Sequence, residues 1–148
     1  MPTRFAVVTG SSTGIGHATV DRLASSGWHV WGGVRTDADA RRISQTSGVH
    51  ALRMDVTDDS EIDNAFAEVE KGTSSSGLDL LVVNAGIVVA GPLELLTREQ
   101  WREQFEVNVI GVAATIRAAL PILRLAEDPR IIVVGSINSR VGVPLLGP

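Results

Sequence analysis

The sequence predicts an α/β domain built on a doubly wound parallel sheet. Short apolar runs alternate along the chain with helical segments, at a spacing that gives parallel strands joined by right-handed crossover helices. Strands of such sheets are covered on both faces and are therefore continuously apolar. Five runs of this kind are present, at 5–8, 28–31, 49–54, 78–83 and 131–134. The 148 residues are long enough for one domain of this type.

The first two connections are predicted to be helical as well, but the best-defined helix spans 57–72. Its apolar residues recur at the spacing of a single buried helical face: Ile62, Ala65, Phe66 and Val69. Acidic residues occupy its first turn, Lys71 its last, and Gly72 marks its end. The Gly- and Ser-rich stretch 72–77 is then predicted to be a surface loop.

A further long helix is predicted from Thr97 to Leu120. Thr97 and Gln100 have the spacing of a capping box, and Pro121 favours an end at the preceding residue. Asn108 lies on the face of this helix that should be apolar. Because a buried amide left unpaired costs about 1–3 kcal/mol, we expect Asn108 to find partners or to distort the helix locally.

Composition argues against several classes of function. Thirteen basic and seventeen acidic residues give a net charge of −4, and no basic cluster indicates a nucleic-acid partner. No unbroken apolar run approaches the roughly 20 residues of a membrane span, and no signal-peptide pattern is present. Cysteine is absent and the three histidines lack the spacing of metal ligands, so no metal is expected. A cytoplasmic protein that binds neither nucleic acid nor membranes is the expectation.

The strongest functional signal is the glycine-rich turn that follows the first apolar run. It reads Thr-Gly-Ser-Ser-Thr-Gly-Ile-Gly over 9–16. Glycines let a backbone turn tightly and approach a diphosphate, whose charge is met by amide N–H groups and by the positive end of the next helix. A plain tight turn between strand and helix is the alternative. We expect a cofactor site formed by Gly10, Ser11, Ser12, Thr13, Gly14, Ile15 and Gly16.

The spacing of these three glycines resembles that of the short-chain dehydrogenase/reductase family. Four later motifs extend the resemblance over essentially the whole chain: Asp55-Val56, Asn84-Ala85-Gly86, Asn108 within 107–111, and Ser136 after the fifth run. The resemblance implies a Rossmann fold over residues 1–148 that is incomplete at its C-terminus. It also implies that the full-length protein is a homo-oligomer, assembled through the helix from Thr97 to Leu120.

Two of these motifs are expected in the cofactor cleft. The resemblance implies that Asp55 and Val56 contact adenine, although Asp55 could instead cap the chain before the next helix. The same resemblance gives the segment Asn84, Ala85 and Gly86 both a sheet-stabilising and a cofactor-lining role. A purely structural alternative is that Asn84 bonds the neighbouring backbone and Gly86 makes the turn.

Two further residues are candidate catalytic groups by resemblance. Asn108 would support a water-linked proton relay to a catalytic lysine. Ser136 would hydrogen-bond the substrate carbonyl or alkoxide, a polarising rather than a nucleophilic role, with Ser139 as the less favoured candidate.

The end of the second strand bears on the choice of cofactor. Relatives that prefer NAD carry an acidic residue there, which bonds the ribose 2′-hydroxyl, whereas this sequence has Val34 followed by Arg35. The positive charge of Arg35 would attract a 2′-phosphate, so NADP is favoured and NAD is the second choice. Arg35 could also be a solvated arginine, since Arg41 and Arg42 show that the next helix is basic, and Thr13 lacks the positive charge that some NADP users carry.

The family places a Tyr-x-x-x-Lys motif about 13 residues after the catalytic serine, which from Ser136 reaches just beyond Pro148. The sequence contains no tyrosine. That tyrosine acts as general acid or base, and the lysine lowers its pKa. We therefore expect the 148 residues to be inactive alone, with the run 131–134 as an open sheet edge, and to belong to a chain of about 250 residues. The gene beyond Pro148 should then encode Tyr-x-x-x-Lys.

The sequence thus predicts an oxidoreductase that transfers a hydride between NADP(H) and a small secondary alcohol, ketone or aldehyde. The alternative from a different class is a non-catalytic NADP-binding sensor or scaffold module. A flavodoxin-like or methyltransferase-like domain would share the sheet topology but not this set of motifs.

Overall fold

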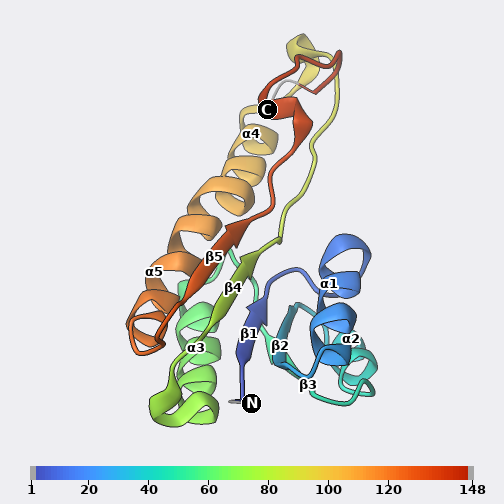
Figure 1. Cartoon of the computed structure of the whole chain (residues 1–148). Helices are drawn as coiled ribbons and strands as arrows, with labels where there is room; N and C mark the ends of the chain where they lie inside the picture. The colour runs from blue at the N-terminus through green and yellow to red at the C-terminus, as the bar shows by residue number, and fades with distance from the viewer. Residues whose placement is uncertain (1–2, 147–148) are drawn as a thin grey trace.

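The computed structural model describes residues 3–146, which form a five-stranded parallel sheet in the order β3-β2-β1-β4-β5. The strands are β1 (Phe5–Val8), β2 (His29–Val34), β3 (Val49–Arg53), β4 (Leu80–Val83) and β5 (Arg130–Val133). The chain builds outward from β1 to β3, then crosses to the other side of β1 for β4 and β5 (Figure 1). The point where the order reverses therefore lies between β1 and β4. The predicted doubly wound parallel fold is confirmed.

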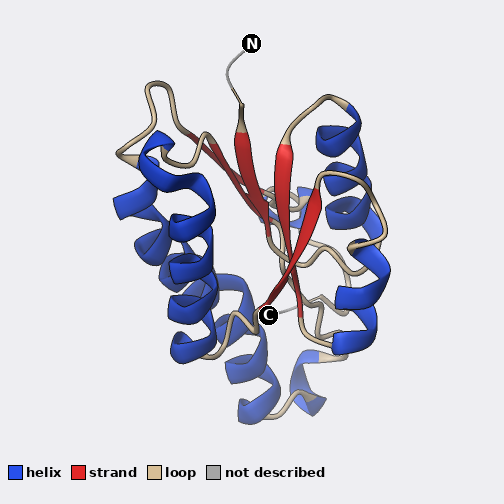
Figure 2. Ribbon diagram, turned by 90° about the horizontal axis from the view of Figure 1, so that it is seen from below, coloured by secondary structure: helices blue, strands red, loops and turns tan. Residues whose placement is uncertain are grey.

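Two layers of helices cover the sheet (Figure 2). Helices α1 (Gly14–Ser25) and α2 (Asp37–Ile43) pack with Ala6 and Val8 of β1 on one face. Helices α3 (Asp59–Thr73) and α5 (Gly111–Leu123) pack with Val7 on the other. Alternation along β1 therefore divides the apolar core into two clusters, because successive side chains of a strand point to opposite faces.

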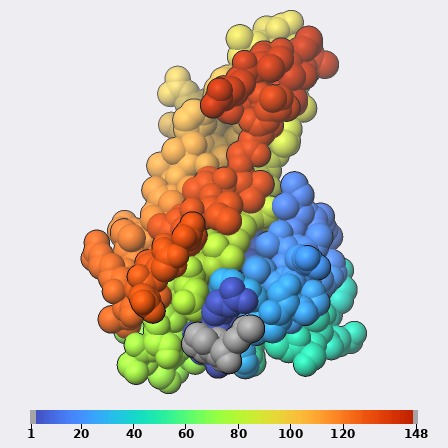
Figure 3. Space-filling model, in the orientation of Figure 1, coloured from blue at the N-terminus to red at the C-terminus, as the bar shows by residue number. Residues whose placement is uncertain are grey.

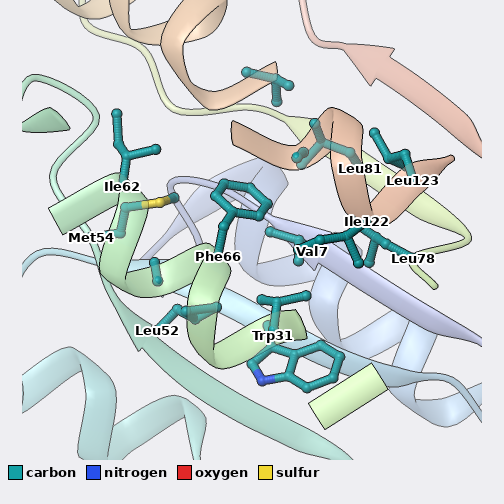
Figure 4. Packing of buried hydrophobic residues seen from close by; sticks show 14 of the residues in the cluster. Val7, Trp31, Leu52, Met54, Ile62, Phe66, Leu78, Leu81, Ile122 and Leu123 are labelled. Carbon is teal, nitrogen blue, oxygen red and sulfur yellow. The ribbon is translucent and has the colours of Figure 1, made fainter. Parts of the chain in front are cut away.

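The larger cluster explains why α3 does not end at Gly72 as predicted. Trp31 lies under α3 (Figure 4), and a Cβ on Gly72 would stand only 2.4 Å from its ring atom Cζ2. Gly72 is thus a contact position inside the helix, which continues to Thr73 and into the 3-10 turn η1 (Ser74–Ser76). The prediction of a loop over 72–77 is therefore largely wrong. The chain changes direction at Ser74 and Gly77, both of which have positive φ.

The apolar run 28–31 marks only the first part of the second strand, whose end at Val34 is confirmed. β2 continues beyond Trp31 through two glycines to Val34. A Cβ on Gly32 would lie 2.7 Å from Cδ1 of Ile43, so the missing side chain lets α2 approach the strand closely. Glycines weaken the sequence pattern that predicts a strand. Here they allow close tertiary packing.

The helix predicted from Thr97 is present, and its capping box is confirmed. The Thr97 hydroxyl accepts from Gln100 N at 3.2 Å, and the Gln100 side chain accepts from Thr97 N at 2.9 Å. The helix has three parts: α4 (Arg98–Phe105), a π-helical turn η3 (Glu106–Ile110), and α5. It runs past Pro121 to Leu123, so the predicted end at Leu120 is wrong. Pro121 has no N–H to donate to the carbonyl four residues earlier, so the last turns of the helix lack that hydrogen bond.

By length and composition alone, this continuous helix could cross a membrane. An 18-residue window within Arg98–Leu123 has a mean hydropathy of 1.5, and 33% of that window is buried. The segment contains no long unbroken apolar run because isolated polar residues interrupt it. In the structure α5 packs on α3 and β4, and a core helix of an α/β domain passes the same test of composition.

The open edge predicted for the fifth strand is confirmed among residues 3–146. β5 pairs only with β4, and its side chains are exposed, with Ile131, Ile132 and Val133 at 41%, 50% and 52%. Beyond β5, the chain runs beside the loop that leads from β4 to α4 (Figures 1 and 3). Gly91 N donates to Leu145 O at 2.8 Å and joins the two segments.

The cap of α3 makes a prediction about pH. Asp58 accepts hydrogen bonds from the Ser60 hydroxyl at 2.5 Å, from Ser60 N at 2.8 Å and from Glu61 N at 3.1 Å. The hydrogen bond from the Ser60 side chain, followed by that from the Glu61 backbone, lowers the Asp58 pKa below its ordinary 3.8. A lowered pKa means that the ionised carboxylate stabilises the fold above pH 3.8, and that this contribution is lost as pH falls through the folded-state value.

We therefore expect Asp58→Asn, which keeps a capping oxygen but removes the charge, to lower the Tm at pH 7 and to have a shrinking effect below about pH 4. Thermal unfolding of both proteins between pH 7 and pH 3 tests this. Asp63→Asn, in the middle of the same helix, is the control. An Asp58→Asn effect that stays constant over this range would contradict the capping role.

Candidate cofactor site

A pocket of about 280 Å³ opens at the carboxyl edge of the sheet, where the order of strands reverses. Ligands of open α/β sheets bind at such a position. The pocket lies between the glycine-rich turn after β1, the end of β2, the segment after β3 and the segment after β4. The residues that line it are Gly10, Ser12, Thr13, Gly33, Val34, Arg35, Met54, Asp55, Val56, Asn84, Ala85, Gly86, Ile87 and Val107.

The glycine-rich turn has a shape that only glycines allow. Gly10 and Gly14 have φ of 64° and 59°, in the left-handed region that side chains disfavour. A Cβ on Gly16 would lie 2.3 Å from the Gly10 carbonyl oxygen, and one on Gly10 would lie 2.8 Å from Ala85 Cα. The first and third glycines are thus required by close packing within the turn and against the end of β4.

The start of α1 is suited to an anion. Thr13 is the N-cap residue, and its side chain makes no capping hydrogen bond, so the first N–H groups of α1 are not satisfied by the cap. No acidic residue stands in the first turn. The positive end of the helix dipole and these amides favour a phosphate at this place. Ile15 is 65% exposed beside it.

Thr9 and Asn84 join the turn to β4. The buried Thr9 hydroxyl accepts from the backbone N–H groups of Asn84 and Ala85, each at 2.9 Å. The Asn84 amide donates in return to the Thr9 and Gly10 carbonyl oxygens at 3.0 and 3.1 Å. Asn84 therefore bonds the neighbouring backbone, as the structural alternative has it, and also lines the pocket. Gly86 lines the pocket too, and lies close to Asn108.

Three other candidate residues lie around the far end of the pocket. Asp55 accepts from the Thr57 N–H at 2.9 Å and from the Thr57 hydroxyl at 2.8 Å, so it turns the chain before α3 while its segment lines the pocket. Val56 is buried and Arg35 is exposed, and both line the pocket. Ser11, by contrast, points into the protein: its side chain is fully buried and donates to Val8 O at 2.7 Å.

Asn108 both finds partners and sits in a distorted helix. Its side chain accepts from Ile87 N and donates to Ile87 O, each at 2.9 Å, so both ends of the amide are bonded to the backbone of one residue. It lies in the π-helical turn, where Gly111 N bonds Glu106 O. One turn earlier, Gln104 accepts from Val89 N. These two side chains fix the backbone that leaves β4, although neither lines the pocket.

Ser136 follows β5 and lies outside the pocket lining. Its hydroxyl oxygen accepts from Asn138 N at 3.1 Å, which leaves the hydroxyl proton available to donate. Ser139, the rival candidate, donates its hydroxyl to Ser136 O at 2.8 Å. The local bonding therefore favours Ser136 over Ser139 as a donor to a ligand.

Sequence reasoning missed several residues that contribute to this region. Met54, Ile87 and Val107 line the pocket, but nothing in their residue type marked them out. Arg42 donates to the Ser12 carbonyl oxygen across 30 residues of sequence. The position of Arg42 in α2 could have indicated that its side chain faces the glycine-rich turn. It could not have identified the Ser12 carbonyl as its partner. Among residues 3–146, no group of three His, Cys, Asp or Glu side chains is placed to hold a metal ion.

The sheet order and the ligand-binding edge define a Rossmann-like α/β domain. Residues 4–148 match the family model described as short chain dehydrogenase, and the chain belongs to this family. A solved short-chain dehydrogenase from Streptomyces avermitilis is 28% identical with a TM-score of 0.88, over 98% of this chain and 53% of its own. The flavodoxin-like and methyltransferase-like alternatives are thereby excluded.

Two curated relatives are more similar in sequence to this chain than that solved structure is. An NADPH-dependent 3-dehydrocapnine reductase from Ornithobacterium rhinotracheale is 34% identical over 98% of this chain and 53% of its own length. A 3-amino-tetrahydro-pyrrolizinone reductase from Xenorhabdus hominickii is 35% identical over 99% and 50%. The chain thus spans about half the length of the curated relatives it matches.

The contribution of the Thr9 hydroxyl to stability can be tested by substitution. Thr9→Val keeps the volume but leaves two N–H groups without their acceptor, so we expect a loss of about 2–4 kcal/mol in the free energy of unfolding. Thr9→Ser keeps the hydroxyl and loses one buried methyl, about 1 kcal/mol. Urea unfolding of both variants measures the difference. Equal stability of the two variants would show that the hydroxyl is not needed.

Proposed function

We propose that this chain forms the cofactor-binding part of an NADP-dependent oxidoreductase that interconverts a secondary alcohol and a ketone or aldehyde. The observation that carries the proposal is the pocket formed by the glycine-rich turn together with Arg35 at the end of β2. Membership of the family supports a nicotinamide cofactor. The NADPH dependence of one relative supports the choice of NADP.

The residues present fit a dinucleotide. The uncapped start of α1 leaves backbone amides to meet a diphosphate, and the close packing at Gly10 and Gly16 excludes side chains at these two positions. Asp55 and Val56 would border the adenine, and Arg35 would meet a 2′-phosphate. The segment Asn84 to Gly86 would border the cofactor on the side of β4.

When bound, NADP(H) would supply or accept the hydride. Ser136 would hydrogen-bond the substrate oxygen through the proton that its local bond leaves available. Asn108, whose amide is satisfied by Ile87, would act through the backbone geometry of the π-helical turn in support of a proton relay. Since residues 1–148 contain no tyrosine, we propose that these residues alone do not turn over substrate.

Comparison of NADPH with NADH tests the cofactor assignment. We expect NADPH to bind more tightly, and Arg35→Ala to weaken NADPH binding about tenfold or more while changing NADH binding less than about threefold, because a charge-assisted bond contributes about 1.5–3 kcal/mol. Isothermal calorimetry measures both. Arg41→Ala, which removes the same charge from the neighbouring helix, is the control. No heat with either dinucleotide would overturn the proposal.

We further propose that copies of the full-length protein assemble through the helix Arg98–Leu123. Phe105, Val109 and Ile110 are each about half exposed on it, at 49%, 49% and 53%. Val109→Asp should therefore shift the protein to a smaller species in sedimentation velocity, because a charge would be buried at the interface. Leu125→Asp, at 54% exposure outside the helix, should not. The reverse pattern would contradict this assembly.

A further inference from the structure

Arg42 connects helix α2 to the middle of the glycine-rich turn. Its guanidinium donates to the Ser12 carbonyl oxygen and also pairs with Asp39 at 2.6 Å. Asp39 is itself held by the cap of α2, since its carboxylate accepts from the Thr36 hydroxyl at 2.7 Å and its N–H donates to the same oxygen at 3.1 Å. Four residues from two segments thus form one chain of hydrogen bonds that ends on the turn.

The bond to Ser12 fixes the orientation of a peptide group. A peptide is planar, and its C=O and N–H point to opposite sides. When Arg42 holds the Ser12 carbonyl, the Thr13 N–H is therefore held facing away from Arg42. Ser12 and Thr13 lie between Gly10 and Gly14, which both have positive φ, and glycines without a Cβ leave the backbone on either side able to adopt other conformations. Both residues border the pocket.

The network also sets the charge at one end of the pocket. Arg35 lines the pocket beside Ser12 and Thr13, and Arg42 reaches the same segment from α2. Asp39 offsets part of the Arg42 charge, and the pair is partly screened because the two side chains are 49% and 26% exposed. A doubly charged phosphate monoester at this end would be attracted by both guanidiniums, whereas a ribose hydroxyl would not.

We propose that Arg42 is a positioning residue that sets selectivity for a 2′-phosphorylated dinucleotide. It acts by fixing the Ser12–Thr13 peptide and by adding positive charge beside Arg35. This inference rests on the proposed NADP-dependent function, and goes beyond it by assigning a role to a residue of α2 that does not line the pocket.

The adenosine halves of the cofactor, 2′,5′-ADP and 5′-ADP, separate this role from a general one. We expect Arg42→Met to weaken 2′,5′-ADP about three- to tenfold and 5′-ADP less than about twofold in calorimetric titrations, so that the ratio of the two affinities falls. Arg42→Lys keeps the charge and one donor, and should recover at least part of the ratio. Arg41→Met, an equal loss of charge on the same helix, should leave the ratio unchanged.

Thermal unfolding of each variant first establishes that it is folded, and Arg42→Lys provides the comparison should Arg42→Met not be. An unchanged ratio in Arg42→Met, equal losses for both ligands, or the same loss in Arg41→Met would overturn the role of Arg42 while leaving the proposed function intact. Failure of the unsubstituted protein to bind 2′,5′-ADP would instead overturn the proposed function, and this inference with it.

Discussion

The packing of the glycine-rich turn against the end of β4 is the constraint on which the site depends. The side chains of Thr9 and Asn84 make four hydrogen bonds between these two segments, and Gly10 and Gly16 are too close to their neighbours to carry side chains. Side chains thus hold the turn against the end of β4, and the first N–H groups of α1 are left without a side-chain cap. A cofactor phosphate needs such a preformed set of donors, because ordering a flexible loop would offset part of the binding energy.

The same device recurs one segment further along the chain. Asn84 bonds two carbonyl groups of the turn, and Asn108 pairs with both backbone groups of Ile87. Beyond the ends of the strands, backbone N–H and C=O groups have no neighbouring strand to bond. In each case a side-chain amide supplies the missing hydrogen bonds. The π-helical turn provides the extra residue that lets the Asn108 side chain reach this backbone. Irregular segments that shape the pocket are therefore as well bonded as regular ones.

The fold was predictable because its main signals are local. Apolar runs, the capping box at Thr97 and the glycine spacing all depend on residues near one another in sequence. The errors arose where a distant partner decides the outcome. Gly72 lies inside a helix at a point where Trp31 occupies the space of a side chain, and Gly32 lies inside a strand at a point where Ile43 does so. Likewise, the sequence shows two arginines at the end of α2, whereas the contact of Arg42 with Ser12 depends on the tertiary structure.

The pocket and the surroundings of Ser136 differ in how well residues 3–146 enclose them. The pocket is lined by residues at or just after the ends of β1, β2, β3 and β4, and strands β1, β2 and β4 are largely buried. Ser136 instead follows β5, where three consecutive apolar residues are exposed although consecutive residues face opposite sides of the sheet. An apolar strand of this kind is typical of one covered on both faces, and no element among residues 3–146 covers it. The pocket is therefore formed by elements that pack on one another within residues 3–146, whereas Ser136 follows a strand whose apolar side chains are about half exposed.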